Sequence, residues 1–526
     1  MAKKFFVTTP IYYVNDIPHV GHAYSTIGAD VLARFKRACG LEVFFLTGTD
    51  EHGQKVEKAA KEKGFDTPRA FVDSIVPHFK EAWRVLDITY DRFIRTTDED
   101  HKAVAAEFWK RVQAAGYIEK RGYEGWYCMY EEAFHLEKDL VQPGNLCPEC
   151  GRPVQRMKEE NYFFKLTAFK DRLKAFLAAN PDLVQPESRR NEVLGSYLAA
   201  EDGVQDVSIS RSTLKWGIPV PGDPQQVIYV WFDALLNYLT ATGWPAVGYK
   251  DLWPADVHII GKEILRFHAV LWPAMLEAAG EQAPKRVFGT GWIVNDGKKM
   301  SKSLGNVVDP IDWSNRYGSE VLRYYLLREI PFGLDGSISE SGIEGRYNAE
   351  LANGLGNLLS RGAALCEKNQ VVFTAWDGPQ DGDGELLAAA RSMQRVYLLS
   401  MESLAFHDAL EAVNELIRAA NKYVDERAPW TLAKDKSPEG QRTLAHVLYC
   451  VAEAGRLCLV ALAPVMPKTA DKGLALLGYP SGSVFGERSE AKGAGLDKLL
   501  AWGLLPAGTQ LTKGEGLFPR REAVKA

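Results

Sequence analysis

Apolar positions along the first 60 residues alternate between short β-rich runs and longer helical stripes. KFFVTT is a compact β-rich run, and the next segment, AYSTIGADVLARFKRACG, places apolar residues on one helical face, at Ile27, Val31, Leu32 and Phe35. LEVFFLTGTDEHG repeats the pattern of a buried strand followed by a glycine-bearing turn, and strand-then-helix units return at QQVIYVWFDALLNYL and DVHIIGKEILRFHAVLWPAML. This order predicts an α/β fold built on a doubly wound, Rossmann-like parallel sheet.

Two changes in residue composition and periodicity divide the rest of the chain. From about residue 117 to 224, a cysteine pair, many aromatic residues and frequent Pro and Gly predict an insert that interrupts the sheet. From about residue 345 onward the strand signals end, and long helical periodicities predict an all-α bundle. The predicted units are the two halves of the sheet domain at 1–116 and 225–296, the insert at 117–224, a loop and contact region at 297–350, and the helical domain at 351–526.

Composition narrows the cellular setting. The chain is 46% hydrophobic and 25% charged, and we see no apolar stretch approaching the roughly 20 residues that a membrane helix needs. The N-terminus, MAKKFFVTTP, lacks the apolar core and cleavage site of a secretory signal, so we expect a cytoplasmic protein. Seven cysteines in 526 residues do not form a disulfide framework, and the close pair Cys147 and Cys150 favours metal binding. The net charge of −5 gives no sign of nucleic acid, although a local basic face can coexist with an acidic total.

The segment PHVGHAY, residues 18–24, lies where the first strand gives way to the first helix. Peptide N–H groups at a helix start are unsatisfied, and the helix dipole there favours an anion. Gly21 lets a ligand approach the backbone, and His19 and His22, three residues apart, can both face it. This pattern predicts a polyphosphate site. The alternative is that the two histidines only cap the helix start.

A second element, NDGKKMSKSLGN at residues 295–306, carries three lysines and two serines within six positions. Lysines on a glycine-flanked loop suit phosphates whose charge shifts during a reaction, although a lysine run in isolation is more often a solvated surface loop. Together, His-x-Gly-His near the N-terminus and Lys-Met-Ser-Lys-Ser after the sheet resumes are the paired signatures of the class I aminoacyl-tRNA synthetases. The chain resembles that family along nearly its whole length.

The resemblance narrows to the methionyl-tRNA synthetases, whose characteristic segments are similar to TTPIYYVNDIPHVGHAYSTIGADVLARFKRACG, GTDEHGQK, YVWFDALLNYL, IIGKEILRFHAVLWPAML and NKYVDERAPW, in the same order. It implies a methionine pocket at Ile11, Tyr13, Asp50, Trp231, Ala234, Leu235, Tyr238, Ile264 and His268. A thioether is recognised by shape and by sulfur–aromatic contact, which an apolar and aromatic wall supplies, and Asp50 suits the substrate's ammonium group. Without the resemblance, these aromatic residues would be interpreted as core packing.

The resemblance also implies the reaction: ATP activates methionine to methionyl-AMP, and the methionyl group passes to the 3′ end of tRNA(Met), with Mg²⁺ accompanying the nucleotide. It assigns His19 and His22 to the phosphates, Gly21 to clearance over the nucleoside, and Lys299 and Lys302 to the β- and γ-phosphates. The remaining ATP-binding residues that it implies are Ser301, Gly289, Gly291, Trp292 and Ile293. The sheet domain would then be the catalytic domain.

The insert carries an incomplete cysteine knuckle. Zinc-bearing members of the family place two close ligand pairs here; Cys147 and Cys150 fit one pair, but the position three after Cys128 is Glu131. We predict a Zn²⁺ site made by the three cysteines and Glu131, with His135 as the substitute fourth ligand. The alternative is a degenerate knuckle that holds no metal.

In the helical domain, Asn357 and Arg361 are four residues apart and share a helix face, and Trp430 follows Pro429. These three match the family's anticodon-reading set, in which an unpaired base stacks on an aromatic ring and its edge is hydrogen-bonded. Outside the resemblance, such an Asn/Arg pair is usually solvated surface. The remaining alternatives are another class I ligase and a non-catalytic RNA-binding scaffold. We expect a monomer.

Overall fold

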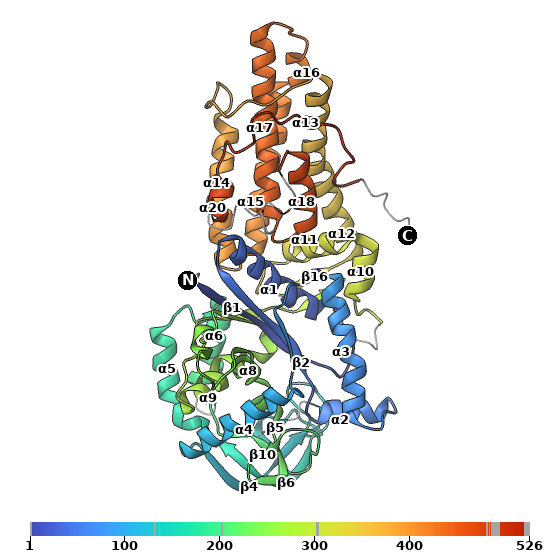
Figure 1. Ribbon diagram of the computed structural model, residues 1–526. Coiled ribbons are helices and arrows are strands. Elements are labelled where there is room, and N and C mark those ends of the chain that lie inside the picture. Colours follow the sequence, from blue (N-terminus) through green and yellow to red (C-terminus); the bar gives the residue numbers. More distant parts are fainter. Residues whose placement is uncertain are drawn as a thin grey trace.

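The structure is a computed structural model that describes residues 3–130, 133–135, 137–200, 203–300, 305–479, 482, 484 and 495–519. Figure 1 shows an elongated molecule in which a sheet-containing part lies below a column of helices. The N-terminal part of the chain lies in the sheet, the insert forms the lower end of the molecule, and the later residues form the helical column.

The main sheet has six strands, and every neighbouring pair is parallel. Its strands in spatial order are β3 (Arg92–Arg95), β2 (Glu42–Asp50), β1 (Lys4–Tyr13), β12 (Val257–Gly261), β13 (Val287–Thr290) and β7 (Val184–Gln185). The predicted doubly wound parallel sheet is confirmed. Because the chain proceeds from β1 to β2 on one side and reaches β12 on the other, the strand order reverses at β1, and ligands of such sheets bind outside the carboxyl ends of the strands at this point.

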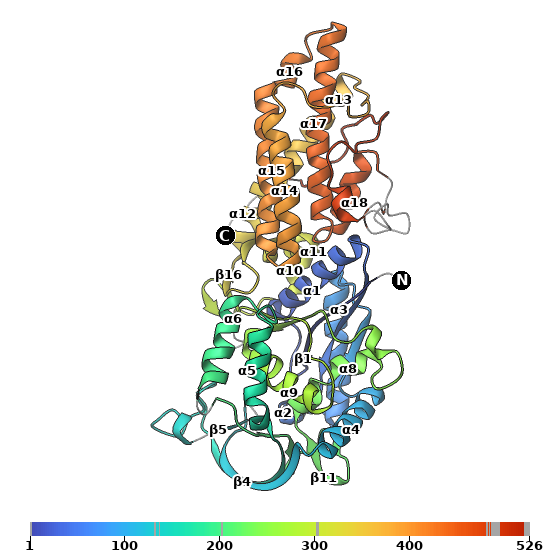
Figure 2. The ribbon, with the colours of Figure 1, turned by 90° about the vertical axis from the view of Figure 1, so that its left-hand side faces the viewer.

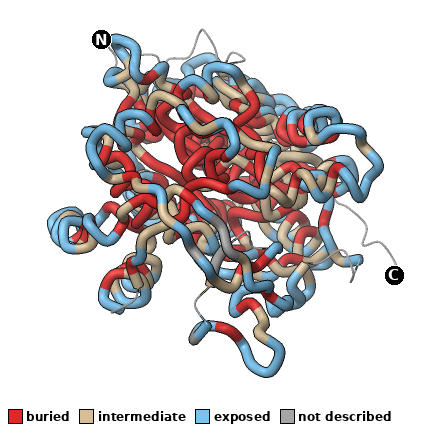
Figure 3. Tube along the Cα trace, turned by 90° about the horizontal axis from the view of Figure 1, so that it is seen from below, coloured by how far each residue is buried: buried red, intermediate tan, exposed pale blue. Residues whose placement is uncertain are grey.

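Helices pack on both faces of the sheet. They are α1 (Val20–Ala38), α2 (Gln54–Glu62), α3 (Pro68–Val85), α4 (Glu99–Ala114), α7 (Val230–Ala234), α8 (Asn237–Thr242) and α9 (Trp272–Ala278). Successive residues of β1 point to opposite faces, so Phe5 and Val7 join the apolar cluster that contains α1 and α3, while Phe6 joins the cluster that contains α4 and α9. Figure 3 shows buried residues gathered toward the centre of the molecule, with exposed segments around them.

The insert is built from two small antiparallel sheets. The first has the order β5 (Ala133–His135), β4 (Ile118–Cys128), β6 (Gln155–Phe164), β8 (Val207–Ser208), and the second has the order β10 (Pro219–Val220), β11 (Asp223–Ile228), β9 (Ser210–Arg211). Figure 2 shows the curved β4 at the lower end of the molecule. Helices α5 (Lys170–Ala179) and α6 (Glu187–Glu192) follow β6. Strand β7 also lies within the stretch predicted as an insert, yet it pairs with β13 in the main sheet, because Leu183 and Val184 bury their side chains in the core.

Between the sheet and the helical column lie β14 (Ile293–Asn295), β15 (Lys298–Lys299), β16 (Gly336–Ile338), α10 (Pro310–Tyr317) and α11 (Ser319–Glu329). The column contains α12 (Glu340–Arg346), the π-helical turn η8 (Tyr347–Gly356), α13 (Asn357–Lys368), α14 (Gly384–Glu402), α15 (Phe406–Arg427), α16 (Pro429–Leu432), α17 (Pro438–Leu462), α18 (Pro467–Leu476) and α20 (Leu496–Leu499). The predicted all-α region is confirmed. Figures 1 and 2 agree that α17 runs along the middle of this column.

Helix α17 corrects one statement drawn from the sequence. It has 25 residues and a mean hydropathy of 1.5 over its most apolar stretch, so by length and composition it passes as a membrane span. However, 94% of that stretch is buried inside the protein. Helices α13, α14, α15 and α18 pack around it, which explains the apolar composition, and α17 is therefore a core helix of the bundle.

A buried ion-pair network joins the sheet domain to the helical column. Asp30 of α1 accepts from Arg34 at 2.8 Å and lies 2.7 Å from Arg323 of α11. Arg323 also donates to the backbone oxygens of Pro464 and Val465, which connect α17 to α18. The helix that begins at the histidine motif is thus held directly against the helical domain.

Candidate active site

The histidine motif forms a reciprocal helix cap at the reversal point of the sheet. His19 is the N-cap of α1, and its Nδ1 accepts a hydrogen bond from the Gly21 N–H at 3.1 Å. The Nδ1 of His22 accepts from the His19 N–H at 3.2 Å, and the two rings stack with centroids 3.8 Å apart. A Cβ on residue 21 would approach His19 Cε1 to 2.9 Å, so glycine is needed here for the ring as well as for any ligand.

Burial makes both imidazoles neutral near pH 7. It lowers the pKa of His19 to about 4, and burial together with the neighbouring His19 lowers the pKa of His22 well below its ordinary value. Because each Nδ1 accepts from a backbone N–H, each ring carries its proton on Nε2. The pair can therefore offer two Nε2–H donors, but no positive charge, to an anion at the helix mouth.

The segment that follows the lysine loop touches the same helix mouth. The N–H of Val20, the first residue of α1, donates to the Val308 oxygen at 2.9 Å. At the other end of the loop, Lys299 lies in β15, which pairs with β14. Ser301 and Lys302 lie outside the described residues. The segment that directly follows the lysine loop is therefore a neighbour of the histidine cap in space, although nearly 300 residues separate them in the sequence.

The GTGWIV segment runs from β13 into β14 beside a cluster of charged residues. Trp292 is partly exposed, and Lys262 Nζ and Lys299 Nζ lie 4.0 Å and 5.1 Å from the centroid of its ring. Its indole N–H donates to Glu263 at 3.1 Å. The sequence interpretation missed Lys262, because only the fold brings it next to the lysine loop.

The glycines of this segment have steric roles of their own. A Cβ on Gly291 would come within 2.1 Å of the Leu334 backbone, and one on Gly289 would come within 3.2 Å of the Arg189 side chain. Gly291 is therefore required for the close passage of the 334–335 backbone, whatever ligand binds nearby. Ile293 is buried in the core cluster that contains α1.

Of the predicted methionine-pocket residues, Ile11, Tyr13 and Asp50 lie toward the carboxyl ends of β1 and β2, and the others lie on the elements that follow β11 and β12. Tyr13 and Asp50 are register partners in the β1–β2 pair. Ile11, Trp231 and Ile264 pack against the apolar cluster that includes Leu235 and Tyr238, and the rings of Trp231 and Phe267 stack at 3.9 Å. Ala234 and Asp50 are buried. Apart from Asp50, the residues of this predicted wall pack as apolar and aromatic groups.

The hydrogen bonds of two polar side chains in this wall fix which of their atoms donate and which accept. The Nδ1 of His268 donates to the Ile264 oxygen at 3.1 Å, so its Nε2 accepts from the Tyr238 hydroxyl at 2.8 Å. Burial lowers the pKa of His268 to about 4, partly offset by the bond to the Ile264 oxygen. His258, stacked on Tyr238 at 4.0 Å, is a buried neighbour that the sequence interpretation missed. His268 and Tyr238 are therefore uncharged near pH 7, which suits contact with an uncharged substrate side chain.

The cysteine knuckle gathers three sulfurs and one imidazole. Cys128 Sγ lies 3.5 Å from Cys150 Sγ, and Cys147 Sγ lies 3.3 Å from the Nε2 of His135. The ligand atoms of Cys128, His135 and Cys147 all lie within 4.8 Å of one another. Glu131, named as the fourth ligand from the sequence, lies outside the described residues. The donor set Cys₃His is one that tetrahedral zinc commonly uses, so these residues fit Zn²⁺.

At the far end of the molecule, the structure brings Arg361 and Trp430 together. The Arg361 guanidinium carbon lies 5.5 Å from the Trp430 ring centroid, and its Nη2 pairs with Asp425 at 3.1 Å. Asn357 begins α13, one turn before Arg361. Trp430 is 43% exposed, so a flat ligand can reach its ring.

Comparison with known proteins agrees with this architecture. Residues 5–363 match the family model described as tRNA synthetases class I (M). The chain is 46% identical over 529 residues to the methionine–tRNA ligase of Caldanaerobacter subterraneus subsp. tengcongensis, covering 100% of this chain and 80% of that one. It is 44% identical to the Thermotoga maritima methionine–tRNA ligase, covering 99% of this chain and 81% of that one.

Solved structures give the same result. Mycobacterium tuberculosis methionyl-tRNA synthetase in complex with methionyl-adenylate is similar with a TM-score of 0.91 and 43% identity, over 98% of this chain and 100% of that one. The apo form has a TM-score of 0.85 and 40% identity, over 100% and 99% of the two chains. The parallel sheet, the histidine cap at the start of α1 and the family match together define a class I aminoacyl-tRNA synthetase. Within that class, the chain belongs to the methionine–tRNA ligase family.

Proposed function

We propose that this protein activates methionine with ATP and transfers it to the 3′ end of tRNA(Met) in the cytoplasm, acting as a monomer in protein synthesis. The structural observation that supports this most is the hydrogen bond from Val20 to Val308, which joins the histidine cap to the segment that follows the lysine loop. The second support is identity of 43–46% with methionine–tRNA ligases over nearly the whole chain.

In the first step, a carboxylate oxygen of methionine attacks the α-phosphorus of ATP, the bond to the bridging pyrophosphate oxygen breaks, and pyrophosphate leaves. In the second, a ribose hydroxyl of the terminal adenosine attacks the methionyl carbonyl carbon, AMP departs with the anhydride oxygen, and the hydroxyl proton is released. Neither step needs a protein nucleophile, so the protein contributes positioning and electrostatic stabilisation.

Each predicted residue then has a physical task. The neutral His19 and His22 donate from Nε2–H to phosphate oxygens, and Lys299 and Lys302 supply the positive charge that the histidines lack. Ser301 and the segment Gly289, Gly291, Trp292 and Ile293 complete the nucleotide site. Mg²⁺ accompanies ATP and is held by the phosphates themselves.

The amino-acid site and the RNA site complete the assignment. Asp50 binds the methionine ammonium group, and the wall from Ile11 to His268 encloses the thioether. Asn357 and Arg361 hydrogen-bond the edges of anticodon bases, while Trp430 stacks on one of them. This proposal is tested by methionine-dependent ATP–pyrophosphate exchange: exchange with methionine supports it, and no exchange above background overturns it.

Zinc has a structural role in this proposal. Cys128, Cys147, Cys150 and His135 would hold it, and the bound ion would fasten β4 and β5 to the loop around Cys147. Metal analysis separates the two candidate fourth ligands. We expect about one zinc per chain in the wild type and in Glu131→Ala, and a loss in His135→Ala. Zinc lost only in Glu131→Ala would reverse the assignment.

A further inference from the structure

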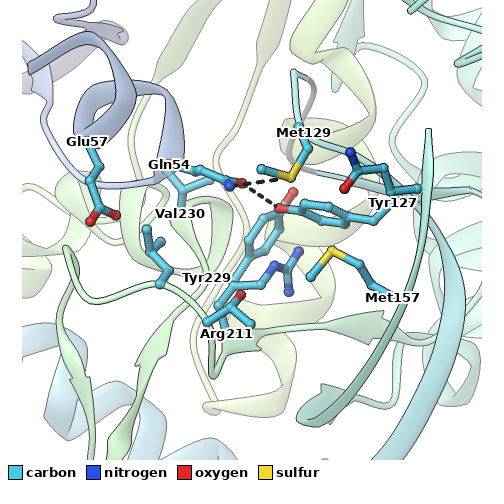
Figure 4. Close-up of a pocket in the computed structure, with 11 residues that line it drawn as sticks. Gln54, Glu57, Tyr127, Met129, Met157, Arg211, Tyr229 and Val230 are labelled. Atoms are coloured by element: carbon cyan, nitrogen blue, oxygen red, sulfur yellow. Dashed lines mark hydrogen bonds between the residues drawn. The ribbon is translucent and has the colours of Figure 1, made fainter. Parts of the chain in front are cut away.

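The cavity of about 270 Å³ between the insert and the catalytic domain adjoins the predicted methionine pocket. Figure 4 shows Val230 among its lining residues, and Val230 directly precedes Trp231. The cavity therefore belongs to the site described above. A separate cluster of metal-ligating side chains lies in the helical column, where neither the proposed chemistry nor the anticodon assignment uses it. Its members are Asp383, His446 and Cys450, and all three are buried.

The cluster joins the start of one helix to the face of another. Asp383 is the N-cap residue of α14, and His446 and Cys450 lie four residues apart on α17. Because that spacing is about one helical turn, the imidazole and the thiol share a face of α17. Helices α14, α15 and α17 pack against one another, and Figures 1 and 2 show them side by side in the column.

The three side chains direct an oxygen, a nitrogen and a sulfur toward one point. Nε2 of His446 lies 2.7 Å from Oδ2 of Asp383 and 3.6 Å from Sγ of Cys450, and the three ligand atoms all lie within 4.8 Å of one another. From this convergence we infer that Asp383, His446 and Cys450 form a second zinc site, separate from the cysteine knuckle.

The donor set identifies the class of ion. Zn²⁺ accepts thiolate sulfur, imidazole nitrogen and carboxylate oxygen as ligands, whereas Mg²⁺ and Ca²⁺ take oxygen ligands. A thiol and an imidazole therefore favour Zn²⁺. In the bound form Cys450 would be a thiolate and Asp383 a carboxylate, and His446 would carry its proton on Nδ1. The two negative charges would balance the ion inside the protein, where an uncompensated charge is costly.

Neighbouring groups hold the donor atoms in orientation. Asp383 Oδ2 accepts from the Gln380 N–H at 2.7 Å, and Asp383 Oδ1 accepts from the Tyr423 hydroxyl at 2.8 Å. The ring of His446 stacks on that of Trp376, with centroids 5.3 Å apart. Contacts of this outer kind orient metal ligands and raise the affinity for the ion. Three protein ligands leave the fourth tetrahedral position to a water molecule.

The helical cluster should bind zinc more weakly than the cysteine knuckle. The knuckle offers three sulfurs and one imidazole, whereas the helical cluster offers one sulfur. The hydrogen bond between His446 and Asp383 must also open before an ion can enter. We therefore expect the knuckle to keep its zinc through purification and the helical cluster to fill when metal is added. The isolated chain would hold about one zinc, and the titrated chain about two.

The cluster lies close to the predicted anticodon-reading residues. Tyr423, whose hydroxyl binds Asp383, lies on α15 seven residues before Trp430. A bound ion would therefore fasten α14 to α17 and, through Tyr423, hold the end of α15 that leads to Trp430. Because the ion binds the folded bundle, it would also stabilise that bundle against unfolding.

Cobalt titration tests the site in the intact, zinc-containing protein under anaerobic conditions. Co²⁺ occupies the tetrahedral sites that Zn²⁺ uses, and a cobalt–thiolate bond gives a charge-transfer absorption band. We expect the wild type to bind about one Co²⁺ per chain with this band and to retain the zinc of the knuckle, as measured by equilibrium dialysis with metal analysis. Cys450→Ala should lose the band and bind Co²⁺ at least about 100-fold more weakly. Tyr423→Phe should keep the band and bind about 10- to 100-fold more weakly.

Cys458→Ala is the matched control, because Cys458 is a buried cysteine of the same helix outside the cluster, and it should bind Co²⁺ as the wild type does. His446→Gln serves as the second ligand variant, for use if Cys450→Ala fails to fold. Added zinc should raise the Tm of the wild type and leave that of the folded ligand variant unchanged.

Two results would overturn the inference. One is a wild type that binds no Co²⁺ beyond the ion of the knuckle. The other is Co²⁺ binding of equal affinity in the wild type and in a folded ligand variant, because the ion would then lie elsewhere. Neither result depends on pyrophosphate exchange, so a failure of the metal site is distinguishable from a failure of the proposed function.

Discussion

The Trp430→Ala variant tests anticodon recognition separately from the activation of methionine. The indole is 43% exposed and contacts Arg361, which keeps its own ion pair with Asp425 when the ring is removed. The substitution therefore removes a stacking surface and leaves the bundle core intact. Stacking of one unpaired base on an aromatic ring contributes about 1–3 kcal/mol, so kcat/KM for charging tRNA(Met) should fall about 5- to 140-fold.

The assay compares charging with methionine-dependent pyrophosphate exchange, which needs no tRNA. Exchange should remain at the wild-type level in Trp430→Ala, and Trp430→Phe should recover most of the charging because it keeps an aromatic face. Leu399→Ala is the control, since Leu399 is another exposed apolar residue of the bundle and should affect neither reaction. Charging at the wild-type rate in Trp430→Ala would refute the stacking role, and parallel losses in both reactions would point to a folding defect.

Three further predictions address the nucleotide site and the domain junction. Lys302→Ala should reduce kcat of pyrophosphate exchange and leave the affinities for methionine and ATP nearly unchanged; exchange equal to wild type would remove its role. Burial holds the pKa of His19 near 4, below its ordinary value of 6.5, so its contribution to stability is complete above pH 6.5 and is lost as pH falls toward 4. Between pH 6.5 and pH 4, the free energy of unfolding of His19→Asn should therefore fall by about 3 kcal/mol less than that of the wild type. An equal fall in both proteins would contradict the assignment. Burial raises the pKa of Asp30, but the positive charges of Arg323 and Arg34 outweigh burial and bring that pKa to about 2. Asp30→Asn should therefore lower the free energy of unfolding, measured in urea, by about 3–5 kcal/mol. A change below about 1 kcal/mol would show that the network contributes little.

The order of elements was predictable because strand and helix periodicities are local. Which elements lie side by side in space was not predictable. The position of β7 at the sheet edge, for example, depends on burial of Leu183 and Val184 in a core that distant strands build. The composition of α17 was misjudged for the same reason: a helix buried on all sides has the hydropathy of a membrane span.

The sequence suggests a candidate site where residue types are grouped, as in the histidine motif and the lysine loop. Contacts between distant segments could not be read from it. Examples are Lys262 beside Trp292 and the pairing of Arg361 with Trp430. The protonation state of His19 also required the structure, because it follows from burial and from the bond that its Nδ1 accepts.

The central claim is that the histidine cap and the lysine loop bind the same triphosphate. A crystal structure of the protein with methionine and a non-hydrolysable ATP analogue tests it directly. We predict Nε2 of His19 and of His22 within hydrogen-bond distance of phosphate oxygens, with the Lys299 and Lys302 ammonium groups on the same triphosphate. A triphosphate bound away from the α1 N-terminus, or contacted by only one of the two elements, would contradict the claim.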